Sequence, residues 1–136
     1  MIAPWHGGGP ENPERMLLAQ AAQAADTGYC LWWWRERSSG ELVGYCGLNR
    51  DRVEGEPVVE VGWSITPRRW GEGLAPEAAR AAVDWGFQRA GLDRIVSFTM
   101  VDNLRSQRVM EKLGMARVRE FERGGLPHLL YELRAG

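Results

Sequence analysis

The chain has 136 residues, 44% of them hydrophobic, and a formal net charge of −1 at pH 7. This length supports one globular domain, residues 1–136, whose core is large enough to fold alone, and it excludes two such domains. A charge so close to zero gives no overall attraction to nucleic acid or to an anionic membrane. Because the sequence also lacks a secretory signal and any apolar run of roughly 20 residues, we expect a cytoplasmic protein without a membrane span.

The first part of the chain predicts an irregular arm, a helix and a β-hairpin. Residues 1–13 are rich in Gly and Pro and predict the arm, and the helix begins at Glu11 or Asn12 and ends near Gly28. Residues 29–37 predict a strand, and residues 41–48 predict the strand that returns after a short turn.

Three consecutive tryptophans lie on the first of these strands. Trp33 faces the opposite side from Trp32 and Trp34, so at least one large ring must lie at a surface, a groove or an interface. The chain has two cysteines, Cys30 and Cys46, one on each strand of the hairpin. Without a CxxC pattern we expect free, buried thiols and no metal site.

A central strand follows a polar stretch, residues 50–57, which predicts a loop. In residues 58–66 the apolar side chains alternate with Glu60, Gly62 and Ser64. This alternation predicts one face in the core and one face, carrying Glu60, that is available for chemistry.

The strand leads into a glycine-bearing loop and a second helix. Pro67 ends the strand, Gly71 and Gly73 allow positive φ angles, and apolar spacing predicts a helix from Leu74 to Gly91. The unpaired N–H groups at a helix start, preceded by such a loop, bind anions and typically phosphate. The alternative is an ordinary strand-to-helix turn whose arginines are solvated.

The remaining segments predict a second strand–helix unit and a closing hairpin. Residues 94–101 read as a buried strand, which a right-handed crossover would place parallel to the central strand. A helix over residues 103–113 is capped by Asp102 or Asn103, and residues 117–122 and 128–133 form the hairpin.

Two stretches resemble motifs of the GNAT superfamily of N-acetyltransferases. Residues 68–73, Arg-Arg-Trp-Gly-Glu-Gly, resemble the R/Q-x-x-G-x-G/A signature, and residues 102–115 resemble the later N-x-x-S/A…E-K-x-G-F/M helix. The residues that flank the first motif, 62–67 and 73–78, look like the RimJ/RimL branch, which acetylates α-amino groups of ribosomal proteins and other amines.

The resemblance implies an α/β (α+β) fold with a mixed, centrally splayed sheet flanked by helices. It also implies acetyl-CoA as co-substrate and no metal, with the pyrophosphate at the glycine loop and the pantetheine between the splayed strands. The residues that would contact the cofactor are Ser64, Ile65, Arg68, Arg69, Trp70, Gly71, Gly73, Leu74, Ala75, Asn103 and Ser106. The usual first strand has no counterpart here, so either another subunit covers the sheet edge, as in a homodimer, or the protein is shorter than its relatives.

The chemistry implied by the resemblance is direct attack of an amine on the thioester in a ternary complex. Main-chain N–H groups near Ser64 and Ile65 would bind the carbonyl oxygen, and Glu60 is the candidate base for the amine. Ser106 would either protonate the thiolate or hydrogen-bond the cofactor. The tyrosine acid of many relatives is replaced by Met110, and His128 is a weaker candidate for contact with the acceptor.

Two functions from different classes remain open. The first is an acyltransferase that acetylates a protein N-terminal amine or a small amine, and the carboxylates Glu54, Glu56 and Glu60 would favour a cationic acceptor. The second is a module that binds acyl-CoA with little turnover. ATP binding is disfavoured because the chain contains no GxxxxGK[ST] sequence.

Overall fold

The computed structural model describes residues 13–136, and within the first helix it describes side chains from Leu18 onward. The arm predicted for residues 1–13 lies outside these residues, except for Pro13, which begins the first helix. The helices and strands are α1 (Pro13–Thr27), β1 (Leu31–Arg35), β2 (Leu42–Val53), β3 (Glu56–Ile65), a short 3-10 turn (Pro67–Arg69), α2 (Leu74–Gln88), β4 (Arg94–Met100), α3 (Leu104–Lys112), β5 (Ala116–Arg123) and β6 (Leu126–Arg134).

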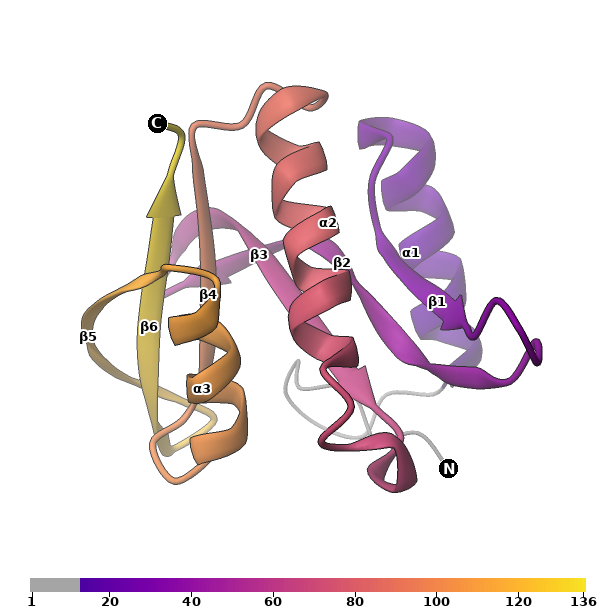
Figure 1. Ribbon diagram of the computed structural model, residues 1–136. Helices are drawn as coiled ribbons and strands as arrows, with labels where there is room; N and C mark the ends of the chain where they lie inside the picture. Colours follow the sequence, from indigo (N-terminus) through magenta and orange to yellow (C-terminus); the bar gives the residue numbers. More distant parts are fainter. Residues whose placement is uncertain (1–12) are drawn as a thin grey trace.

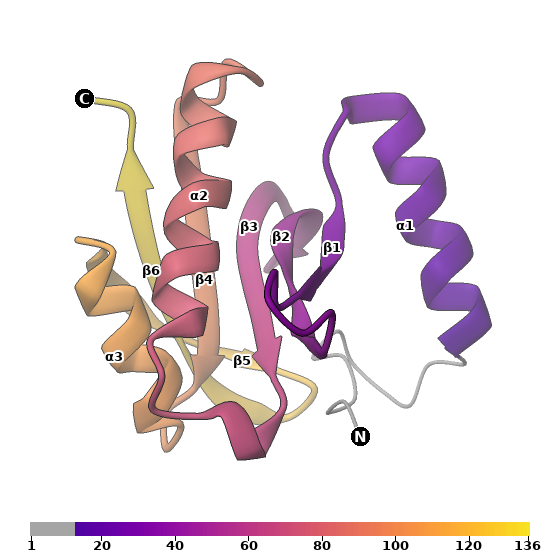
Figure 2. The same cartoon turned by 45° about the vertical axis from the view of Figure 1, so that its right-hand side comes forward.

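The strands form a single mixed sheet in the order β1-β2-β3-β4-β6-β5. Among the strands of residues 13–136, only the β3–β4 pair is parallel, as the crossover through α2 predicts, and the other neighbours are antiparallel. Figures 1 and 2 show α2 and α3 on one face of this sheet, with α1 on the far side of β1 from α2. The predicted α/β fold, with a mixed sheet flanked by helices, is therefore confirmed.

The β2–β3 hairpin differs from its prediction. The polar residues 50–57 do not form a loop, because β2 continues to Val53 and β3 begins at Glu56. The two strands join through a tight turn at Glu54 and Gly55, whose φ angles are 50° and 82°. Two successive positive φ angles are typical of the hairpin turn whose twist matches that of the strands, and they let this polar ribbon close without a longer loop.

The parallel pair β3–β4 opens into a gap soon after it forms. Glu60 opposite Val96 is the paired position between the two strands, although each strand has at least seven residues. Just beyond it, the buried Ser97 hydroxyl donates a hydrogen bond of 3.0 Å to the Val61 carbonyl oxygen. A side chain thus satisfies an oxygen that the missing ladder would otherwise leave unpaired.

Each face of the sheet has its own apolar cluster. The larger one packs under α2 and α3 and includes Leu48, Val61, Ala79, Val83, Ile95, Met110 and Leu113. The smaller one covers the opposite face and consists of Val53, Val96, Phe98, Phe121 and Leu130. Glu60 points to this second face, beside the smaller cluster.

Helix α1 is fastened to the sheet by two glutamines. The buried Gln23 amide donates to the carbonyl oxygens of Tyr29 and Leu48, each at 3.1 Å. The Gln20 side-chain oxygen accepts from the Leu31 N–H at 2.8 Å. These bonds pair main-chain groups at the start of β1 and fix the helix beside β2. No helix within residues 13–136 is long and apolar enough to cross a membrane.

Candidate functional site

The glycine loop leaves the start of α2 open to a ligand. Gly71 and Gly73 have φ angles of 84° and 77°, and a Cβ at either position would meet no atom within 4 Å. Gly73 is the N-cap of α2 and supplies no side-chain cap. The first N–H groups of the helix, which in most helices bond to a capping side chain, therefore face the loop with their partial positive charge.

A pocket of about 220 Å³ lies between this loop and α3, and we call it the loop pocket. It is lined by Ile65, Arg69, Trp70, Gly71, Gly73, Leu74, Ala75, Pro76, Arg105, Arg108, Val109 and Lys112. Seven of the eleven predicted cofactor residues lie here. The others, Ser64, Arg68, Asn103 and Ser106, do not line it.

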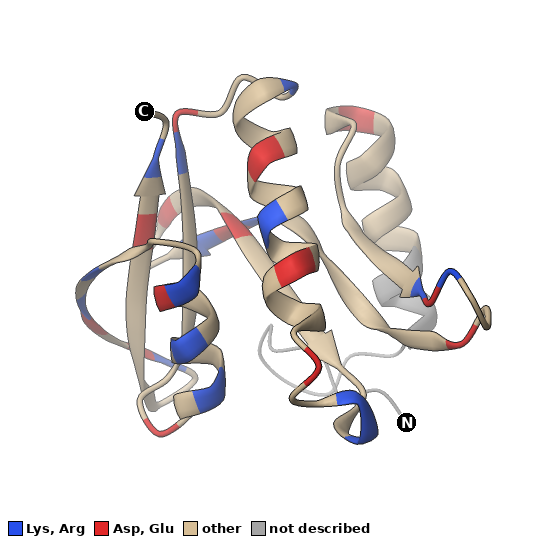
Figure 3. Ribbon diagram, viewed as in Figure 1, with Lys and Arg blue, Asp and Glu red and all other residues tan. Residues whose placement is uncertain are grey.

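The positive charge of the loop pocket comes largely from three side chains of α3 that the sequence analysis did not name as cofactor contacts. Arg105, Arg108 and Lys112 follow one another at intervals of three and four residues, which places them on one face of the helix. Figure 3 shows α3 banded in blue beside the loop before α2. The sequence signal that could have identified these residues was their spacing, which places three cations on one face of a predicted helix.

Trp70 closes one side of the loop pocket. Its indole N–H donates to the Ile65 carbonyl oxygen at 2.8 Å, which ties the loop to the end of β3. The Arg105 guanidinium lies 3.7 Å from the centre of the indole ring, within the range of a cation–π contact. The contact joins α3 to the loop across the pocket.

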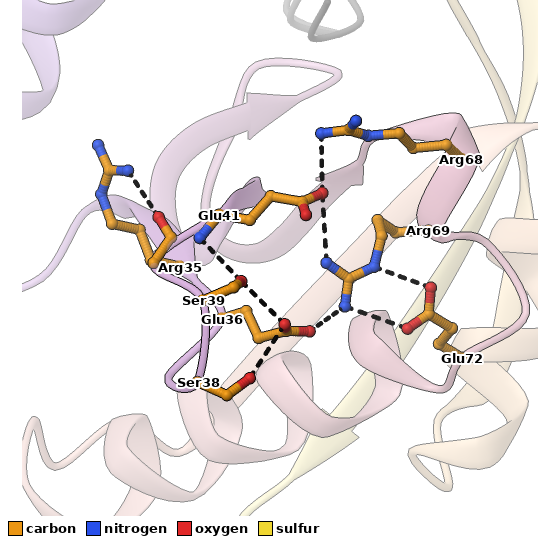
Figure 4. Close-up of polar contacts among 9 residues, drawn as sticks. Arg35, Glu36, Ser38, Ser39, Glu41, Arg68, Arg69 and Glu72 are labelled. Carbon is orange, nitrogen blue, oxygen red and sulfur yellow. Dashed lines mark hydrogen bonds and ion pairs between the residues drawn. The ribbon is translucent and has the colours of Figure 1, made fainter.

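Arg69 is engaged by carboxylates rather than directed freely into the pocket (Figure 4). Its side chain is 12% exposed and is paired with Glu36, with Glu72 at 2.8 Å and with Glu41 at 3.4 Å. Hydrogen bonds to Glu72 and then Glu36 raise the pKa of Arg69, and the Arg69 hydrogen bond lowers the pKa of Glu36. Arg68 reaches Glu41 at 2.8 Å. The two arginines thus tie the glycine loop to the β1–β2 connection, and a phosphate contact by either one stays a prediction.

At the start of α3, Asn103 is the helix cap. Its side-chain oxygen accepts a hydrogen bond of 3.2 Å from the Ser106 N–H, so the choice left open between Asp102 and Asn103 is settled. Ser106 is half-buried, while Met110 is fully buried and packs in the core under α2. Met110 therefore has a packing role, and the proposed roles of Asn103 and Ser106 in cofactor contact stay predictions.

Glu60 does not lie on an open face, and this part of its prediction is wrong. Its residue exposure is 7%, because β5 and the smaller apolar cluster cover this side of β3. Asn49 donates to its carboxyl oxygen at 3.2 Å, and Asp51 is a further neighbour that is itself paired with Arg123 at 3.0 Å. Burial, followed by the Asp51 carboxylate, raises the pKa of Glu60 to about 8. Near neutral pH the group is therefore mostly protonated and can exchange its proton.

An aromatic wall lies on the same face as Glu60, toward α1. Trp33 is 41% exposed and meets Tyr45 edge to face at 5.5 Å, which confirms that one ring of the tryptophan run reaches a surface. Tyr45 shares a hydrogen bond with Ser64, and burial raises its pKa to about 12. A small cavity of about 200 Å³ adjoins this wall and is lined in part by Gln20 and Leu31.

The other candidates lie away from the loop pocket. The His128 ring lies against Phe98 and Phe121, and its Nδ1 is 2.9 Å from the Leu126 carbonyl oxygen, so its environment is largely apolar. Cys30 and Cys46 are free and buried, as predicted, and burial raises the pKa of both thiols. Across residues 13–136 no group of three or more His, Cys, Asp or Glu side chains is arranged to hold a metal ion.

Comparison with known proteins agrees with this geometry. Residues 3–116 match the family model described as the acetyltransferase (GNAT) domain. The uncharacterized protein YkkB of Bacillus subtilis (strain 168) is 33% identical over 108 residues, which are 79% of this chain and 63% of that protein. The FsC-acetyl coenzyme A-N(2)-transacetylase of Aspergillus fumigatus is 32% identical over 94 residues, which are 65% of this chain and 40% of that protein. The chain thus spans less than two thirds of the length of either relative.

Among solved structures, the acetyltransferase from Agrobacterium tumefaciens str. C58 superposes with a TM-score of 0.78. It is 27% identical in sequence, and the match covers 93% of this chain and 75% of that one.

Proposed function

Because the chain belongs to the acetyltransferase (GNAT) domain family, we propose that it transfers the acetyl group of acetyl-CoA to a primary amine. The observation that carries this proposal is the loop pocket, where an uncapped helix start, two open glycines and three cations of α3 meet beside the parted strands. Unpaired N–H groups and arginines together suit a diphosphate and a further phosphate. The residues present therefore fit the anionic end of CoA.

The parted strands supply the second half of the site. Beyond the Glu60–Val96 pair, the main-chain groups of β3 and β4 no longer bond to each other and can pair with the amide groups of a pantetheine arm. In this arrangement the N–H groups near Ser64 and Ile65, which lie toward the glycine loop, would pair with the pantetheine arm, and the thioester would lie nearer Glu60. The Aspergillus relative, by its name, uses acetyl coenzyme A for transfer to a nitrogen, which supports the same donor here.

Glu60 is the proposed base of the reaction. Its pKa of about 8 lies close to working pH, which suits a group that must take a proton from an amine and release it again in every cycle. Ser106 is the proposed hydrogen-bond donor to the departing thiolate, because the buried Met110 has no proton to donate.

The proposal names acetyl-CoA as the donor, but it names only a class of acceptor, a primary amine. The likeness of residues 62–67 and 73–78 to the RimJ/RimL branch supports a protein N-terminal α-amine. The carboxyl groups expected to favour a cationic small amine support it less, because Glu54 is paired with Arg119, Glu56 is paired with Arg94 at 3.3 Å, and Glu60 is mostly protonated near neutral pH. Attack within a ternary complex, a homodimer that covers the β1 edge and a cytoplasmic location all stay predictions.

The experiment combines CoA calorimetry with a thiol-release assay on a panel of peptides and small amines. Gly71→Asp would place a carboxylate in the loop pocket, so both CoA binding and turnover should be lost. Gly125→Asp is the matched control, because Gly125 has a similar φ of 77° and open space around it but lies in the β5–β6 turn. CoA uptake without acetylation of any amine would favour the binding module, and no CoA uptake by the folded protein would refute the proposal.

A further inference from the structure

Proton accounting requires an exit from the proposed active site. Most primary amines arrive as ammonium ions. When an ammonium ion reacts with acetyl-CoA to give an amide and the free thiol of CoA, one proton is left over. Each turnover therefore releases one proton to solvent. Because the acyl donor and the acceptor would fill the gap beside Glu60, this proton needs a route that neither substrate blocks. This inference rests on the proposed acetyl transfer.

Asp51 lies next to Glu60 on the same face of the sheet. Asn49 is paired with Glu60 across β2 and β3, and Asp51 is two residues further along β2, so its side chain points the same way. A hydrogen bond joins the two carboxyl groups. One of the two must carry the proton of that bond.

The surroundings favour Glu60 as the proton donor in that bond. Arg123 Nη2 lies 3.0 Å and 3.2 Å from the two Asp51 carboxyl oxygens, and the Arg52 N–H donates to one of them at 2.7 Å. In each of these contacts Asp51 is the acceptor, so its oxygens are placed to accept from Glu60 as well. The charged and titratable groups that face Glu60 are then Asp51 and Tyr45 from β2 and Arg123 from β5, while α1 contributes the neutral Gln20 through Asn49.

Asp51 also borders a large cavity at the turn end of β2 and β3, which we call the hairpin cavity. Its volume is about 760 Å³, and its lining residues include Asp51, Arg52, Val58, Asp93 and Arg94. None of its lining residues belongs to the loop pocket. Glu60 does not reach this cavity, so Asp51 is the titratable neighbour of Glu60 that connects it with the solvent there.

We propose that Asp51 is a proton relay that carries the proton from Glu60 to solvent in the hairpin cavity. The O–H bond of protonated Glu60 breaks as an O–H bond forms on Asp51, and Asp51 passes this proton to a water molecule of the cavity. The Glu60 carboxylate left behind then takes a proton from the amine nitrogen, which restores protonated Glu60 beside the Asp51 carboxylate. The exit lies at the opposite end of β3 from the glycine loop, so bound CoA does not block it.

Chemical rescue tests the relay. Asp51→Ala should lower kcat by about tenfold or more, and formate should restore turnover in proportion to its concentration, because the hairpin cavity admits a small carboxylate. Asp93→Ala is the matched control, since Asp93 lines the same cavity from the α2–β4 connection. It should keep wild-type turnover and show no response to formate.

The pH dependence of kcat/KM separates a relay from a merely structural role, because a structural role of Asp51 would leave its inflection unchanged. Asp51→Asn removes the Asp51 charge and leaves Arg123 close to Glu60, so the inflection of kcat/KM should shift to lower pH. The NMR titration of the Glu60 carboxyl carbon should shift in the same direction. An unmoved inflection, or a loss of turnover that formate does not restore, would overturn the relay and leave acetyl transfer standing. A wild-type protein without turnover on any amine would remove both proposals.

Discussion

The buried Glu60 should make the stability of the protein depend on pH in a direction opposite to that of most carboxylates. Burial and the Asp51 carboxylate raise its pKa from 4.5 to about 8 in the folded state. An acid with a raised folded pKa binds its proton more tightly when folded, so its favourable contribution is complete below pH 4.5 and is lost as pH rises through about 8. Glu60→Gln should remove this dependence, because the amide can accept from Asn49 and donate to Asp51 without titrating.

The size of the effect follows from the shift. Each unit of pKa difference corresponds to about 1.4 kcal/mol, so the folding free energy should change by about 5 kcal/mol over the interval. A domain of this kind has a total stability of roughly 5–15 kcal/mol, so the change is a large share of it. The variant should therefore equal the wild type near pH 5 and exceed its stability by several kcal/mol at pH 9.

Urea unfolding followed by tryptophan fluorescence, repeated from pH 5 to pH 9, measures the difference. Glu77→Gln is the control, because Glu77 is exposed on α2 and its variant should follow the wild type at every pH. If the curves of the wild type and Glu60→Gln run parallel over this range, the reasoning about the buried carboxyl is refuted.

Three further changes test other parts of the structure. Arg108→Ala should weaken CoA binding by about tenfold in calorimetry, with a smaller loss at high salt, and unchanged affinity would remove α3 from the phosphate site. Gly47→Ala would place a Cβ 2.1 Å from a main-chain oxygen and should lower Tm sharply, whereas Gly62→Ala, 3.6 Å from its nearest side chain, should be tolerated; equal effects would contradict this. Ser97→Ala leaves the Val61 carbonyl unpaired and should cost about 1–3 kcal/mol in urea unfolding, and no loss would mean that the gap is hydrated.

Local periodicity predicted those parts of the fold whose order depends on neighbours in sequence. The glycine loop, α2 and β4 were predicted closely, because their strand alternation, helical spacing and positive-φ glycines are written in consecutive residues. The polar ends of β2 and β3 that meet at the hairpin turn were not predicted as strands, because their residues do not alternate between apolar and polar. Their stability comes from cross-strand pairs and from Arg123, whose partner Asp51 lies 72 residues away.

The features of the candidate site also differ in how well the sequence predicts them. The open glycine loop followed from a short motif, but the partner of Arg69, Glu36, lies 33 residues upstream in the β1–β2 connection. The burial of Glu60 likewise depends on β5, which follows much later in the chain. Charges such as these are assigned to a ligand or to an ion pair only once the strand order is known.

The geometry of β3 also restricts what kind of donor can use both ends of the site. Ile65 lines the loop pocket, whereas Glu60 lies at the last paired position before β3 and β4 separate. At about 3.3 Å per residue, the two positions are roughly 16 Å apart. A nucleotide that reacts at its own phosphates would place its chemistry at the loop and leave Glu60 out of reach. A donor that grips the loop with its diphosphate and reacts beside Glu60 needs a long, narrow spacer with amide groups, and the pantetheine arm of CoA is such a spacer.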